Sequence, residues 1–226
     1  MTMKCDTLAV GSLEREHLNA MWALFDEHYV GISREVFESD LSQKQKALLL
    51  WRNHKLIGFT SQRFCDIDSH RVIYSGDVII DPDARDMGTA HFFQRWAEGV
   101  WKHCDWWCAL SSGPRTFRIP FTFFNRVTPQ PGSSETDKER ILRHLFAQNA
   151  YGSQYCPDTG IVTLANAYQL RDPVCKMRQD YPMGAYFEQL NPGWLQGDEL
   201  VSLVSLDISN WKPIAKRMLN WKNLDG

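Results

Sequence analysis

The chain has 226 residues, of which 43% are hydrophobic and 23% are charged. These proportions are ordinary for a globular protein, and they exclude a disordered tail, a collagen-like chain and a coiled coil. The 25 basic and 27 acidic residues give a formal net charge of -2, and no basic run exceeds two residues. We therefore expect no nucleic-acid partner, because nucleic-acid binders usually carry a basic excess or stripe.

The sequence has no apolar window of about 18 residues, so we expect no membrane span. The first residues lack the long apolar run of a secretory signal. The six cysteines are too scattered for a disulfide framework; they stand at positions 5, 65, 104, 108, 156 and 175. We expect a reduced, cytoplasmic protein, and the sequence leaves its oligomeric state open.

Helical spacing of apolar residues predicts two N-terminal helices, at 13–29 and 33–44. Short polar turns then separate three apolar runs, which predicts an antiparallel meander with strands at 46–53, 56–67 and 71–81. A helix at 88–103 and a buried strand at 105–112 follow. This strand–helix–strand order predicts a crossover with parallel pairing.

The second half of the chain is less regular. It predicts a helix at 115–125 interrupted at Pro120, a loop at 128–137, a helix at 137–150, a strand at 160–165, irregular chain at 166–198, a strand at 199–207 and a helix at about 209–221. The fold class is therefore mixed α/β (α+β), with both antiparallel and parallel pairing in the sheet.

The most informative segment follows the third strand of the meander. Residues 85–90 read R-x-x-G-x-A at the junction of a strand and a helix. The free backbone N–H groups and the positive dipole of a helix start form an anion site. Gly88 would let a phosphate approach the backbone closely, and the small Thr89 and Ala90 would leave the first turn uncrowded.

This motif, in its context, resembles that of the GCN5-related N-acetyltransferase (GNAT) superfamily, which grips the pyrophosphate of coenzyme A. The resemblance in element order runs from about 13 to 112, with weaker support from 160 to 207. It implies a single GNAT-like domain over 1–226, with a mixed central sheet and helical or irregular insertions at about 113–198. The chain also resembles a bacterial group of unknown function, which shares FESDLSQK, YSGDVIIDP, SSGPRTFR and PDTGIV but supplies no activity.

The GNAT resemblance implies the donor and where it binds. The co-substrate would be acyl-CoA or acetyl-CoA, or an acyl carrier protein as a partner, and no metal would be needed. Pantetheine would contact the backbone of the third strand and pyrophosphate the following turn, through Val78, Ile79, Ile80, Arg85, Asp86, Met87, Gly88, Thr89 and Ala90. This strand would also separate from the strand at 105–112 and leave a wedge for the thioester.

Asp77 is the first candidate for the catalytic base, because it is an acidic residue within an apolar strand. Strand alternation predicts that Ser75, Asp77 and Ile79 share one face, and that Tyr74 and Val78 share the other. A carboxylate beside an apolar wedge would have its pKa raised by desolvation, which suits a base. The alternative is a structural aspartate that accepts hydrogen bonds.

The proton donor for the leaving thiolate is harder to assign. Many members of the superfamily place a tyrosine in the helix after the next strand, whereas 115–125 contains none. Tyr74, Ser111, Ser112 or a water could substitute, although serines at a strand end are more often helix caps. Arg115 and Arg118 could bind phosphate or a carboxylate, or could form ordinary surface pairs.

Two other groups of residues have less specific meanings. Trp96, Trp101, Trp106 and Trp107, with the phenylalanines of 115–125, could line an acyl tunnel or could simply form core. Cys104 and Cys108 stand close to His103, but a change from helix to strand between the cysteines argues against zinc.

We therefore expect an N-acyltransferase that moves an acyl group from acyl-CoA, or from an acyl carrier protein, to a small-molecule amine by direct attack. The alternative on the same fold is a non-catalytic module that senses an acyl-thioester or binds a protein, which the missing tyrosine favours. A serine or cysteine thioester hydrolase and an assembly protein with exposed aromatic residues are further alternatives.

Overall fold

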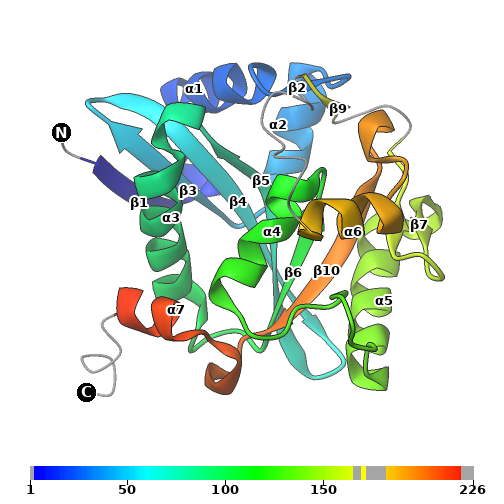
Figure 1. The fold of residues 1–226 in the computed structure, drawn as a ribbon. Coiled ribbons are helices and arrows are strands. Elements are labelled where there is room, and N and C mark those ends of the chain that lie inside the picture. The colour runs from blue at the N-terminus through cyan, green and yellow to red at the C-terminus, as the bar shows by residue number, and fades with distance from the viewer. Residues whose placement is uncertain (1–2, 165–168, 172–181, 220–226) are drawn as a thin grey trace.

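The computed structural model describes residues 3–164, 169–171 and 182–219 (Figure 1). Its centre is an eight-stranded sheet in the order β1-β3-β4-β5-β6-β10-β8-β7. The strands are β1 (Met3–Ala9), β3 (Lys46–Arg52), β4 (Lys55–Ile67), β5 (His70–Ile80), β6 (Trp106–Ser111), β7 (Tyr155–Cys156), β8 (Ile161–Val162) and β10 (Glu199–Ser205). The pair β5–β6 is parallel, and the other pairs in this sheet are antiparallel.

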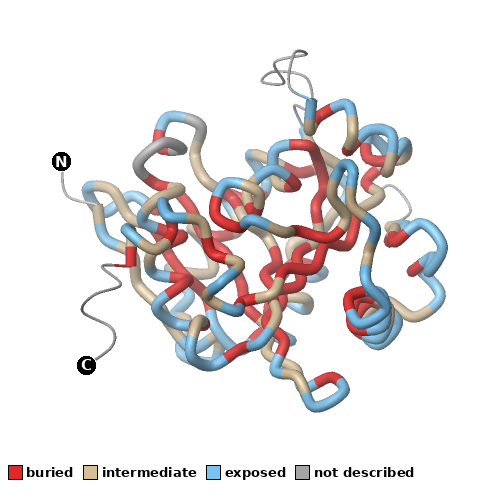
Figure 2. The backbone as a smooth tube through the Cα atoms, turned by 60° about the horizontal axis from the view of Figure 1, so that its bottom comes forward, coloured by how far each residue is buried: buried red, intermediate tan, exposed pale blue. Residues whose placement is uncertain are grey.

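Helices cover both faces of the sheet. One face carries α1 (Arg15–Asp26), α2 (Arg34–Ser42) and α5 (Asp137–Tyr151). The other carries α3 (Arg85–Val100), α4 (Pro114–Phe123) and α7 (Pro213–Met218), and α6 (Pro182–Leu190) packs against α4. A small second sheet pairs β2 (Tyr29–Val30) with β9 (Gln169–Leu170). Figure 2 shows the buried residues concentrated toward the middle of the molecule.

The predicted mixed α/β class, the two N-terminal helices, the meander and the parallel crossover are confirmed. Besides the interruption at Pro120 discussed below, three predictions in the second half are wrong. The strand at 160–165 is reduced to Ile161–Val162, α6 lies in a stretch expected to be irregular, and the last helix spans only Pro213–Met218. The sequence analysis also missed β1, whose residues are only partly buried at the edge of the sheet. Parts of 166–198 lie outside the described residues.

The predicted interruption at Pro120 is also wrong, because α4 continues through it. Proline removes one backbone donor from the helix. Tertiary packing compensates for this loss: Phe117 and Phe123 of α4 are buried, and the Phe124 N–H still donates to the Pro120 carbonyl at 2.9 Å. Within the described residues, no helix is both long and apolar enough to cross a bilayer.

Aromatic stacking fixes α4 against α3. The rings of Phe93 and Phe123 are nearly parallel, with centroids 3.5 Å apart. Phe124 and Trp211 surround this pair in the same core. The position of α4 relative to the sheet therefore depends on a few buried rings.

We expect Phe123→Ala to lower the free energy of unfolding by about 3–5 kcal/mol, because it removes a fully buried ring. Phe121→Ala is the matched control, since Phe121 lies on the same helix but is only partly buried. Denaturant unfolding monitored by tryptophan fluorescence measures both. Equal losses for the two variants would contradict the packing described for Phe123.

Candidate active site

A β-bulge in β5 organises the candidate site. Phe59 pairs with Ile79 and Ser61 with Gly76, so Thr60 lies opposite two residues, Asp77 and Val78. Asp77 has a φ of 49°, in the left-handed region that few non-glycine residues adopt. The bulge inserts one extra residue into the side-chain alternation of β5.

The predicted sharing of one face by Ser75, Asp77 and Ile79 is therefore wrong. Ser75 faces α3, because its Oγ accepts a hydrogen bond of 3.2 Å from Trp96 Nε1. Asp77 lies on the opposite face, where its Oδ2 accepts a hydrogen bond of 3.3 Å from Ser61 Oγ. Beyond the bulge, Val78 lines a pocket beneath α3, and Ile79 packs in the core below α1 and α2.

Strands β5 and β6 separate at the bulge, as the GNAT resemblance implies. Their parallel pairing joins Val72–Ser75 to Trp106–Ala109 and goes no further. From there, β6 continues along β10, where Ser111 pairs with Leu200. A pocket of about 60 Å³ lies at this separation, beneath α3 and α4, and we call it the β5–β6 pocket.

The residues that line the β5–β6 pocket show whether the aromatic side chains form an acyl tunnel or hydrophobic core. Five buried aromatic side chains line it: Phe92, Phe93, Trp96, Trp107 and Phe123. All five also belong to the main hydrophobic core. Phe117 packs instead against α6, and Trp101 and Trp106 are only partly buried. Most of the aromatic residues are therefore core, and a small pocket remains between them.

The R-x-x-G-x-A segment forms the first turns of α3. Its N-cap, Ala84, has no side-chain acceptor to cap the helix. A Cβ at Gly88 would lie 3.0 Å from Leu50 Cδ2 and 3.2 Å from Ile80 Cγ2, so the glycine also allows α3 to pack closely on the sheet. Thr89 lines the β5–β6 pocket. The side chains of Arg85, Asp86 and Met87 lie outside the described part of the structure.

Three acidic side chains, Asp77 among them, lie on the other face of the sheet. We call Asp40, Asp77 and Glu199 the carboxylate cluster; they come from α2, β5 and β10. Burial raises the pKa of Asp77 to about 6, with a further contribution from the charge of Asp40. Burial also raises the pKa of Glu199 to about 8, with contributions from Asp77 and Asp40. Near neutral pH, Asp77 is thus mainly ionised and Glu199 mainly protonated.

Lys44 is the cation beside this cluster. Its side chain is buried, and its Nζ forms an ion pair of 2.9 Å with Asp40 Oδ1. The ammonium also lies 4.8 Å from the centre of the Tyr74 ring. The positive charge of Lys44 opposes the rise in pKa of both Asp77 and Glu199.

Hydroxyl groups complete this face. Tyr151 Oη, from the last turn of α5, donates a hydrogen bond of 3.1 Å to Tyr74 Oη. Burial raises the pKa of both phenols well above the usual value, so both stay protonated. Ser112 Oγ and Tyr29 Oη are 3.2 Å apart. Ser112 is thus held by a buried tyrosine, and no capping bond from it to α4 is observed.

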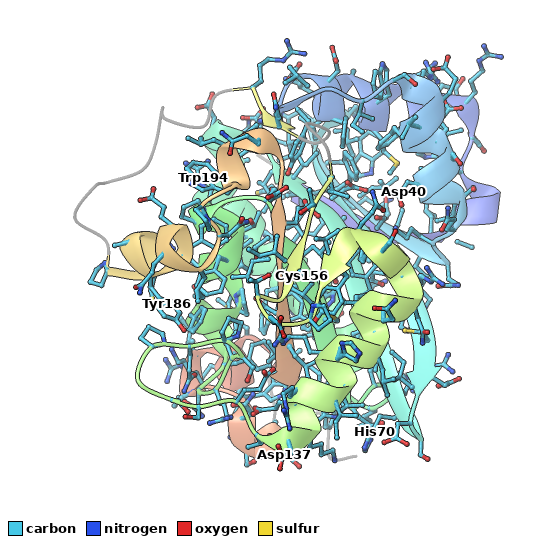
Figure 3. The ribbon with its side chains drawn as sticks, turned by 90° about the vertical axis from the view of Figure 1, so that its right-hand side faces the viewer. Asp40, His70, Asp137, Cys156, Tyr186 and Trp194 are labelled. Carbon is cyan, nitrogen blue, oxygen red and sulfur yellow. The ribbon has the colours of Figure 1, made fainter. Side chains whose placement is uncertain are left out.

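The sequence analysis missed Asp40, Glu199 and Tyr151. Figure 3 shows Asp40 on α2, above the C-terminal end of α5 that carries Tyr151. Glu199 begins an apolar strand, the same kind of signal that singled out Asp77. Asp40 and Tyr151 lie on ordinary helices, and only the tertiary structure brings them here. Arg115 and Arg118 are exposed on α4.

Among the described residues, no group of three or more metal-ligating side chains could hold a metal ion. Cys104 and Cys108 are both buried with free thiols. Burial raises the pKa of Cys104 to about 11 and that of Cys108 well above its usual value. These thiols are therefore poor nucleophiles at neutral pH.

No protein-family model and no curated protein sequence matches the chain. Several solved structures resemble it. The NatC complex bound to Gag peptide and CoA has a TM-score of 0.45 and 15% identity, over 56% of this chain and 86% of that chain. The ribosomal-protein-S18-alanine N-acetyltransferase from Escherichia coli has a TM-score of 0.42 and 15% identity, over 59% and 86%.

An acyl-CoA N-acyltransferase from Pseudomonas aeruginosa also has a TM-score of 0.42, with 16% identity over 54% of this chain and 88% of that chain. All three structures have TM-scores below 0.5. Their likeness to this chain is distant, so the function proposed below depends on the residues of the site.

The raised pKa of Glu199 predicts a pH-dependent stability. Between about pH 4.5 and pH 8 the unfolded chain ionises Glu199 while the folded chain keeps it protonated, so folding stability falls as the pH rises. We expect Glu199→Gln to be more stable than the wild type at pH 8.5 by about 2 kcal/mol, and nearly equal to it at pH 4. Denaturant unfolding at both pH values measures this difference, with exposed Glu188→Gln as the control. If the free energies of unfolding of the variant and the wild type differed by the same amount at both pH values, the burial of Glu199 would be refuted.

Proposed function

We propose that the protein transfers an acyl group from an acyl-CoA donor to a cationic primary amine. One observation carries this proposal: the bulge at Asp77 places a carboxylate on one face of the sheet, while the β5–β6 pocket opens on the other. A thioester in the opening between β5 and β6 would have its carbonyl group between these two regions. The acceptor amine would then approach from the side of the carboxylate cluster.

The donor would be held largely by backbone groups. The uncapped start of α3 suits the pyrophosphate, because free N–H groups and the helix dipole attract anions. Beyond Ser75, β5 has no pairing with β6, so its backbone edge at Val78 and Ile79 can face the pantetheine arm. A carrier-protein donor would present the same arm.

The carboxylate cluster supports a cationic acceptor. An ammonium ion would be attracted by the negative charge of this cluster before it is deprotonated. Asp77 acts as the base, since its pKa of about 6 keeps it ionised at neutral pH yet able to accept a proton. The free amine then attacks the thioester carbonyl carbon, the C–N bond forms and the C–S bond breaks.

The leaving thiolate needs a proton, and the oxyanion of the intermediate needs a hydrogen-bond donor. Glu199 is protonated near neutral pH, and the phenols of Tyr74 and Tyr151 are protonated throughout the usual pH range. We propose Glu199 as the acid, and Tyr74 or Ser112 as the hydrogen-bond donor to the oxyanion. These residues would take the role of the tyrosine that α4 lacks.

The direct test is thiol release from acetyl-CoA with and without primary amines such as a polyamine, an aminoglycoside or a peptide with a free N-terminus. We expect release to require an amine, and Asp77→Asn to reduce the rate about 10²- to 10⁴-fold with little change in donor affinity. Release without an amine would indicate a hydrolase, and CoA binding without release would favour the non-catalytic module.

The pH dependence tests the two carboxyl roles separately. The rate should rise through about pH 6 as Asp77 ionises, and fall above about pH 8 as Glu199 loses its proton. Asp40→Asn removes a negative charge that raises both pKa values, so it should move both limbs of the profile to lower pH. Glu199→Gln should remove the alkaline limb. A profile that neither variant changes would rule out these assignments.

A further inference from the structure

Four residues on neighbouring strands, three of them polar, form a row across the sheet beneath the β5–β6 pocket. Gln62 pairs with Ser75, Ser75 pairs with Ala109, and Ala109 pairs with Ser202, so the row runs over β4, β5, β6 and β10. These side chains share the face covered by α3 and α4. Ser75 and Ala109, in the middle of the row, line the pocket itself.

Three buried polar atoms on this face of the sheet have no hydrogen-bond partner, and the one in Trp107 belongs to a residue that lines the pocket. They are Gln62 Nε2, Ser202 Oγ and Trp107 Nε1. Gln62 is 2% exposed, Ser202 0% and Trp107 5%, and Trp107 lines the pocket. Leaving such groups unpaired in a core is costly, and native proteins rarely do so without a ligand, water or other partner. Ser75 differs, because its Oγ already accepts a hydrogen bond from Trp96.

The pocket above this row is small and uncharged. Its volume of about 60 Å³ leaves room for a few non-hydrogen atoms. Of the described side chains that line it, none is acidic or basic; the polar ones are Thr60, Ser75, Thr89, Thr116, Trp96 and Trp107. Among the described residues, a buried carboxylate would therefore have no cationic partner there, and a long alkyl chain would exceed the volume of the pocket.

We infer that the donor's acyl group is short and carries a neutral oxygen, a hydroxyl or a ketone, which enters the β5–β6 pocket and accepts a hydrogen bond from Trp107 Nε1. This inference rests on the proposed function, because it assigns the part of the donor beyond the thioester. The aromatic walls hold the carbon atoms of the acyl group, and Thr60 and Thr116 are further polar residues that line the pocket.

Binding of matched donors tests this inference without any acceptor. Calorimetric titration would compare CoA, butyryl-CoA, 3-hydroxybutyryl-CoA, succinyl-CoA and octanoyl-CoA. We expect 3-hydroxybutyryl-CoA to bind about 2- to 10-fold more tightly than butyryl-CoA, the range expected for one neutral hydrogen bond. Succinyl-CoA and octanoyl-CoA should bind no better than CoA itself.

Trp107→Phe removes the indole donor and keeps an aromatic wall. It should abolish the preference for the hydroxylated donor while CoA affinity stays within about 2-fold. Trp101→Phe is the matched control, because Trp101 ends α3 outside the pocket and should leave the preference intact. Should Trp107→Phe fold poorly, the comparison of the five ligands on the wild-type chain still tests the inference, because butyryl-CoA that binds as tightly as 3-hydroxybutyryl-CoA overturns it.

The outcomes separate this inference from the proposed function. If CoA binds and butyryl-CoA equals or exceeds 3-hydroxybutyryl-CoA, the inferred acyl group is wrong while the transferase proposal survives. Tight binding of octanoyl-CoA would likewise overturn it, because the pocket would then open into a tunnel. If neither CoA nor any acyl-CoA binds, the proposed function fails together with the inference.

Discussion

The site depends on one backbone feature, the extra residue that Asp77 introduces into β5. The bulge ends the parallel pairing with β6, so the sheet opens at this point. It also turns a carboxylate to the side of α2 and α5, while Val78 faces the pocket beneath α3. A regular strand would pair further along β6 and would place neighbouring side chains on alternate faces. The opening and the placement of the carboxylate therefore have a common cause.

Burial then gives the carboxylate cluster its chemistry. Asp77 and Glu199 both lose solvation, which raises the pKa of each; the charge of Asp40 raises both values further, and the charge of Asp77 raises that of Glu199. Lys44 limits this effect, because its buried ammonium pairs with Asp40. The result is two carboxyl groups with separated pKa values, an arrangement that lets one accept a proton while the other donates one. On the opposite face, aromatic packing leaves only a small uncharged pocket.

Much of the fold could be predicted from the sequence, because the signals are local. Hydrophobic periodicity located the N-terminal helices, the meander and the crossover, and the segment Arg85–Ala90 indeed begins a helix. Asp77 was found because an acidic residue in an apolar strand is unusual. Alternation failed there, since a bulge has no clear signature when the residue in the left-handed conformation is not glycine.

The rest of the site could not be predicted from the sequence, because tertiary packing brings its residues together. Tyr151 reaches Tyr74 across 77 positions of sequence, from a helix within the predicted insertion. Asp40 lies on the polar side of an ordinary surface helix. Local propensity also gave the wrong result at Pro120, where burial of neighbouring phenylalanines outweighs the missing hydrogen bond.

The central claim is that the opening between β5 and β6, with the start of α3, binds coenzyme A. Thermal unfolding of the purified chain with and without CoA tests it most directly. At 100 times its dissociation constant, a ligand that binds only the folded state adds about 2.7 kcal/mol. For a chain of this size the account predicts a rise in Tm of roughly 5–11 °C. An unchanged Tm with millimolar CoA and acetyl-CoA would contradict it.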